Sequence, residues 1–129
     1  MEIYTSYMAN WRHFGNCVPI SVMRYTPKYF EGNSLRILAP PEKVFLDYRN
    51  KKITFSEYSR LYYDFLVNYG FQNIMNAISN ISHGRDVVLL CTCKNILKCH
   101  RLILASFIEE NSTLKVNELP NSNDGTYRV

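Results

Sequence analysis

The chain has 129 residues, of which 47% are hydrophobic, and a formal net charge of +4. These values indicate a single soluble globular domain with an anionic ligand or partner, and the absence of a basic stripe argues against nucleic acid. No apolar run reaches transmembrane length, no basic-then-apolar leader opens the chain, and the four cysteines do not form a secreted disulfide framework. We therefore expect a cytoplasmic protein with no membrane partner.

The first half of the chain predicts two strands and two short helices. Residues 2–7 alternate and are rich in aromatic side chains, and residues 17–23 form a second β-type run. Residues 8–13 between them show no clear period. A short helical turn is expected at residues 28–30 and a helix at residues 42–49, separated by a break at residues 32–34.

The second half of the chain begins with the most secure helix. Thr54 and Glu57 form a capping box, apolar residues then recur at helical spacing to residue 69, and Gly70 ends the helix. A second helix is expected over residues 73–82. Residues 87–90 form a short apolar run typical of a strand buried on both faces. The remaining expected elements are a helix from about Asn95 to residue 110, a strand at residues 114–119, and a polar, flexible tail at residues 120–129.

The alternation of strands and helices predicts the fold class. Strands separated by helices favour a mostly parallel sheet with right-handed crossovers. We expect a small Rossmann-like, three-layer α/β fold covering residues 1–129 as one domain. Residues 87–90 should form its central strand, with helices on both faces.

Polar and aromatic residues that follow the strands predict a ligand site at the carboxyl edge of the sheet. The unpaired N–H groups of the helix expected to begin at Asn95 would add to an anion-binding site there. The candidate ligand-binding residues are Ser6, Tyr7, Trp11, Arg24, Tyr25, Cys91, Lys94, His100, Arg101 and Glu118.

Several segments of the chain resemble a known family. The chain is similar to the YeaO-like domain-of-unknown-function family in its Leu89-Leu90-Cys91 segment followed by Cys99-His100-Arg101. The same family resemblance extends to the opening residues 3–7, to residues 20–27 and to the Ala39-Pro40 helix start. The resemblance covers nearly the whole chain and implies a small Rossmann-like domain without a settled activity. Members usually carry an acidic residue after the strand cysteine, where this chain has Cys93-Lys94-Asn95, which makes the expected site more positive.

The two arginines of the expected site have two interpretations. Arg24 and Arg101 each offer a planar fork of donors that matches a phosphate. The alternative is a structural salt bridge, for example to Glu118 or Asp47. The aromatic residues Tyr7, Trp11 and Tyr25 could likewise stack on a base or supply core area, and the tyrosine stripe at residues 58–69 fits a core or a dimer surface.

The cysteines also allow more than one interpretation. Cys91 fits a nucleophile with His100 as its base, or a small buried hydrophobic group at the end of a strand. The spacing of Cys91, Cys93, Cys99 and His100 matches no standard zinc motif. We expect no disulfide, no stoichiometric zinc and no cofactor.

The sequence therefore predicts binding of a small phosphorylated ligand, such as a nucleotide or an ADP-ribose-type molecule, rather than its turnover. In a phage, such a protein would sequester a host nucleotide signal as an anti-defence protein. The alternative is a hydrolase or transferase that acts on a nucleotide or glycosidic bond through Cys91, His100 or Glu118. The expected partners are the ligand and, as an open possibility, a second copy of the chain.

Overall fold

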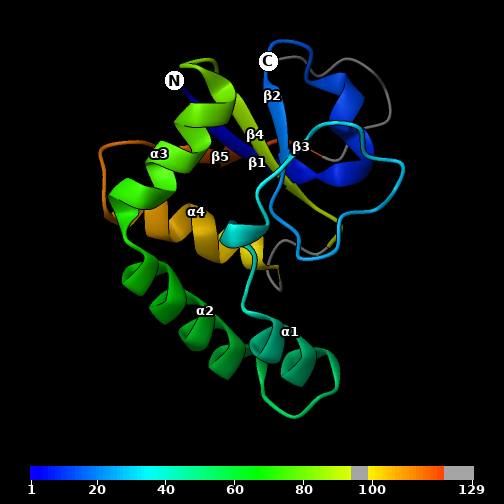
Figure 1. The fold of residues 1–129 in the computed structure, drawn as a ribbon, viewed down its shortest axis with the longest axis vertical. Coiled ribbons are helices and arrows are strands. Elements are labelled where there is room, and N and C mark those ends of the chain that lie inside the picture. Colours follow the sequence, from blue (N-terminus) through cyan, green and yellow to red (C-terminus); the bar gives the residue numbers. More distant parts are fainter. Residues whose placement is uncertain (94–98, 121–129) are drawn as a thin grey trace.

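A computed structural model describes residues 1–93 and 99–120, and a five-stranded, all-parallel sheet lies at its centre (Figure 1). The strand order is β3-β2-β4-β1-β5. The bounds of the strands are β1 Ile3–Tyr7, β2 Val18–Ser21, β3 Asn33–Ser34, β4 Val87–Cys91 and β5 Val116–Glu118. The predicted α/β class and the central position of residues 87–90 are thus confirmed.

The central strand β4 is buried because both faces of the sheet are covered. All five of its residues are fully buried. Val87 and Leu89 point into one hydrophobic core, and Val88 and Leu90 point into a second core on the opposite face. The continuous apolar run that predicted this strand is therefore explained by the alternation of its side chains between two cores.

The α-helices build the larger core. Helix α4 (His100–Glu110) lies between the sheet and α2 (Phe55–Tyr69) in Figure 1, and α1 (Glu42–Arg49) packs beside α2. Helix α3 (Phe71–Ser82) follows α2 directly, with Gly70 between them at a φ of 98°. No helix among the described residues is long and apolar enough to cross a membrane.

The second face of the sheet is covered by the 3₁₀ helix η1 (Met8–His13) and by loop residues such as Phe14 and Phe30. A further short 3₁₀ helix, η2 (Arg36–Leu38), precedes α1. The expected helical turn at residues 28–30 is a hydrogen-bonded turn without a helix. The expected break at residues 32–34 contains the strand β3. Only two residues of β3 pair with β2, and so short a strand leaves no recognisable pattern in the sequence.

The start of α4 differs from the expected helix. Cys99 is the N-cap residue and His100 is the first helical residue. His100 and Arg101 therefore lie in the first turn of α4, whereas a helix that begins at Asn95 would place them about one turn inside it. Lys94 and Asn95, and residues 121–129 of the expected tail, lie outside the described residues.

The capping box of α2 is confirmed and allows a prediction. The Thr54 side chain accepts a hydrogen bond from the backbone N–H of Glu57 at 3.1 Å, and the Glu57 carboxylate accepts one from the backbone N–H of Thr54 at 3.1 Å. We expect Thr54→Ala to lower the free energy of unfolding by about 1 kcal/mol, as measured by urea denaturation. Thr54→Ser should retain most of the stabilisation that the capping box provides. Equal losses in the two variants would contradict a capping role for the Thr54 hydroxyl.

Candidate functional site

The strand order reverses between β2 and β4. The chain leaves β2 toward β3 at one edge of the sheet and leaves β4 toward β5 at the other edge. In open parallel sheets, ligands bind at the carboxyl ends of the strands at such a point. A cavity of about 260 Å³ lies there, lined by Met23 beyond β2 and by Cys91, Thr92 and Cys93 at the end of β4.

Helices α1 and α2 supply aromatic walls to this cavity, which we call the strand-end cavity. Tyr48 and Tyr58 stack with their ring centroids 4.5 Å apart, and Phe45 lies on the same helix as Tyr48. Burial raises the pKa of Tyr58, so this ring stays uncharged. The exposed guanidinium of Arg49 lies 5.5 Å from the centroid of the Phe45 ring and supplies a positive charge at the rim.

His100 lines the cavity but is held by the backbone. Its Nε2 donates a hydrogen bond to the Val22 carbonyl oxygen at 2.7 Å, and its ring meets Tyr62 edge-on. Burial lowers the pKa of His100 to about 4, and the Arg101 charge acts in the same direction. His100 is therefore neutral at neutral pH, and its Nε2 is engaged with Val22 instead of serving as the base of Cys91.

The low pKa of His100 makes the stability of the fold depend on pH. Between pH of about 6.5 and 4, the unfolded chain binds a proton at this residue and the folded chain does not, so stability falls as the pH falls. The slope from this residue reaches at most about 1.4 kcal/mol per pH unit. We expect His100→Gln, which keeps a donor for the Val22 carbonyl, to reduce the dependence of the urea denaturation midpoint on pH over this range. The exposed His13→Gln control should follow the wild type.

Arg101 directs its guanidinium into the interior. The residue is 1% exposed. Nε and Nη2 donate to the two carboxylate oxygens of Glu118 at 3.1 and 2.8 Å. Nη1 donates to the Cys93 carbonyl oxygen at 2.6 Å and contacts the sulfur atoms of Cys91 at 3.0 Å and Cys99 at 3.4 Å. The structure thus shows the salt bridge to Glu118, and each guanidinium nitrogen has a partner within the chain.

Three cysteines meet beside this guanidinium. The Sγ atoms of Cys91, Cys93 and Cys99 all lie within 4.8 Å of one another. The structure pairs Cys91 with Cys99 as a disulfide, so the expectation of no disulfide is wrong. This expectation failed because the spacing of the cysteines in the sequence did not show that Cys99, as the N-cap residue of α4, lies beside the end of β4. Burial raises the pKa of Cys93, while the charge of Arg101 opposes this shift.

The structure brings only part of the predicted site together. Cys91 and His100 line the strand-end cavity, and Tyr25 packs against Phe45 of its wall at a centroid distance of 5.9 Å. Arg24 donates from Nε to the Pro40 carbonyl oxygen at 3.1 Å, near the start of α1.

The other candidate residues lie elsewhere or outside the described chain. Ser6 is buried and donates to the Leu119 carbonyl oxygen, and Glu118 also accepts from the Thr5 hydroxyl at 2.6 Å. Tyr7 ends β1, and Trp11 packs edge-on against Phe30 in the second core. Lys94 lies outside the described residues.

Sequence reasoning missed the walls of the cavity. The missed lining residues are Met23, Phe45, Tyr48, Arg49, Tyr58, Thr92 and Cys93. Tyr58 was correctly assigned to the apolar face of α2, but a helical period does not show that one ring of a packed face also borders a cavity. Arg49 could have been found as a cation in the last turn of a helix that follows the β2 region.

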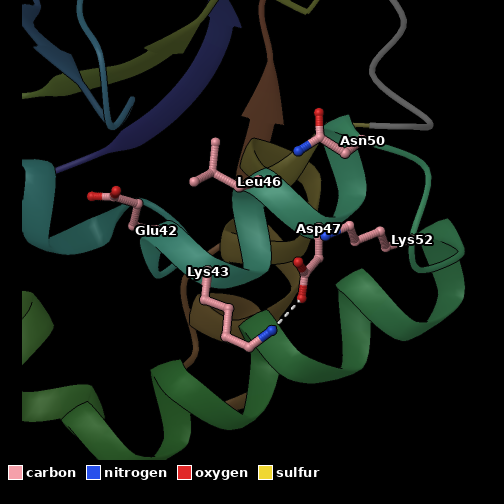
Figure 2. Close-up of a pocket in the computed structure, with 6 residues that line it drawn as sticks. All are labelled: Glu42, Lys43, Leu46, Asp47, Asn50 and Lys52. Atoms are coloured by element: carbon pink, nitrogen blue, oxygen red, sulfur yellow. Dashed lines mark hydrogen bonds and ion pairs between the residues drawn. The ribbon is translucent and has the colours of Figure 1, made fainter.

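Two other hollows among the described residues lie away from the carboxyl ends of the strands. The hollow of about 480 Å³ in Figure 2 lies on α1 and the turn after it, and its six side chains point in different directions. Lys43 and Asp47 there neutralise each other at 2.7 Å. The hollow of about 270 Å³ near Trp11 and Cys17 lies at the amino end of β2, opposite to the strand ends that bind ligands in this fold class.

Comparison with known proteins gives one family. Residues 3–112 match the family model DUF488-N3a, described as the active DUF488-N3 subclade. Comparisons with curated proteins and with solved structures returned no significant match. The matched range contains all the residues that line the strand-end cavity, whereas Glu118 lies beyond it.

Proposed function

This chain belongs to the DUF488-N3a family, and we propose that it binds a small phosphorylated molecule, such as a nucleotide or an ADP-ribose-type compound, in the strand-end cavity. The observation that carries the proposal is the position of the cavity at the point where the strand order reverses, between β2 and β4. Its volume of about 260 Å³ suits a small ligand or one end of a longer one.

The lining of the cavity favours a ligand with a flat ring at one end and a negative charge at the other. The stacked rings of Tyr48 and Tyr58 offer apolar area to a base or a nicotinamide-like ring. Arg49 is an exposed residue at the rim, where a phosphate can reach its guanidinium without losing all its water. In this proposal Arg49 takes the phosphate-binding role that the sequence analysis predicted for Arg24 and Arg101.

Thiol chemistry at Cys91 is the second candidate function. The matched subclade is described as active, and Nη1 of Arg101 donates to the Cys91 sulfur at 3.0 Å. A guanidinium beside a reduced cysteine favours the thiolate, which is the nucleophilic form. In this case Arg101 would be a positioning residue, and the enzyme would be a hydrolase or transferase that acts on the ligand.

The narrower likeness to YeaO-like proteins and a phage anti-defence role by sequestration are parts of the same proposal. Sequestration requires that the ligand be retained unchanged. A cytoplasmic location would fit this role, since the ligand is a small soluble metabolite. Association of two copies of the chain is a further part of the proposal.

The proposal is tested by a thermal-shift screen of nucleotides, ADP-ribose derivatives and cyclic dinucleotides, with unphosphorylated nucleosides as controls. A ligand at a hundred times its dissociation constant should stabilise the fold by about 2.7 kcal/mol, which corresponds to several degrees. Mass spectrometry then shows whether the ligand is returned unchanged, as binding predicts, or altered, as thiol chemistry predicts. If no phosphorylated compound shifts the melting temperature, the proposal is wrong.

A further inference from the structure

We propose that the reduced chain binds a thiophilic divalent metal ion of the zinc class through Cys91, Cys93 and Cys99. The Sγ atoms of these residues lie within 4.8 Å of one another. A Zn–S bond is about 2.3 Å long, and tetrahedral geometry then requires sulfur atoms about 3.8 Å apart. Reduction of the Cys91–Cys99 disulfide frees two of these sulfur atoms, so that three thiolates already gathered at one place can move apart to the separation that one ion needs.

The positions of the cysteines suit a metal site better than their spacing in the sequence suggests. Cys91 ends β4, Cys99 caps α4, and Cys93 follows β4 in the loop. The Cα atoms of Cys91 and Cys99 are 7.9 Å apart. Once the disulfide is reduced, this backbone separation leaves room for the two thiolates to lie on either side of one ion.

Arg101 supplies the charge that such a site needs. Three thiolates around a divalent cation leave a net charge of −1, and a buried negative charge is costly without a partner. Nη1 of Arg101 lies 3.0 Å from the Cys91 sulfur and 3.4 Å from the Cys99 sulfur, which places a fixed positive charge and N–H donors beside the cluster. Such donors orient the ligands of metal sites and stabilise their charge.

The fourth coordination position would open toward the strand-end cavity. Cys91 and Cys93 line this cavity, whereas Arg101 does not, so the guanidinium contacts the cluster from another side. Nε2 of His100 is engaged with the Val22 carbonyl. An ion held by three cysteines beside a cavity would keep one position for water or for an atom of a bound molecule, as in catalytic metal sites. The inference does not depend on the proposed function, because metal binding is measured without an organic ligand.

The test is a titration of the fully reduced, metal-free protein with Co²⁺, followed by displacement with Zn²⁺. We expect one equivalent of Co²⁺ to produce thiolate-to-cobalt charge-transfer absorption, and Zn²⁺ to abolish it. Cys93→Ser, which changes a half-buried residue, should weaken binding by roughly a hundredfold or more.

Cys17→Ser is the matched control, because Cys17 is a buried cysteine remote from the cluster, at the amino end of β2. It should bind Co²⁺ as the wild type does. Protein oxidised to the Cys91–Cys99 disulfide should give no charge-transfer band, since two of the three ligands are consumed. Absence of the band in the reduced wild type, or an undiminished band in Cys93→Ser, would overturn the proposal.

Discussion

Arg101→Ala should cause the largest loss of stability of any substitution that we propose. It removes the guanidinium of a residue that is 1% exposed and takes a donor from four groups: the Glu118 carboxylate, which among the described residues keeps only the Thr5 hydroxyl, the Cys93 carbonyl, and the sulfurs of Cys91 and Cys99. Breaking a fully buried ion pair from one side costs about 3–5 kcal/mol. Because the Glu118 side chain is 33% exposed, we expect a loss of about 2–4 kcal/mol in the free energy of unfolding, measured by urea denaturation.

Arg12→Ala is the matched control for this prediction. Arg12 forms an ion pair with Glu31 at 2.8 Å, the same N···O distance as between Arg101 and Glu118, but both side chains are about two-thirds exposed. Exposed pairs contribute about 0–1 kcal/mol, so the control should lose little. Equal losses for Arg101→Ala and Arg12→Ala would show that Arg101 is not a structural residue.

The framework of the fold was predictable because it depends on local patterns. The apolar run at residues 87–90 and the capping box at Thr54 and Glu57 are each contained in a few adjacent residues, and both are confirmed. β3 was not predictable, since two exposed residues pair with β2 only because the loop around them brings them there.

The candidate site was less predictable because its contacts join residues far apart in the chain. The sequence placed Cys91 and His100 correctly at the strand end, but it could not show which way the guanidinium of Arg101 would turn. That direction depends on Glu118, which is 17 residues away and reaches the cluster only once β5 has paired with β1. The walls of the cavity likewise come from α1 and α2, whose packing no local pattern specifies.

Arg49→Ala should produce the largest loss of ligand affinity. Arg49 is a cation at the rim of the strand-end cavity, and its ring contact with Phe45 fixes the position from which it would reach a phosphate. Charge-assisted hydrogen bonds contribute about 1.5–3 kcal/mol, and the exposure of Arg49 places it at the lower end, so we expect about a tenfold increase in Kd. Arg49→Lys should recover part of the affinity, since it restores the charge but not the planar fork.

The most direct test of ligand binding at the strand-end cavity is an isothermal titration of the strongest compound from the thermal-shift screen into three proteins. These are the wild type, Arg49→Ala, and the control Arg60→Ala, which removes an exposed arginine paired with Asp64 on α2. We predict one site per chain, a Kd about tenfold higher for Arg49→Ala, and an unchanged Kd for Arg60→Ala. Equal Kd values for all three proteins would contradict binding at this cavity.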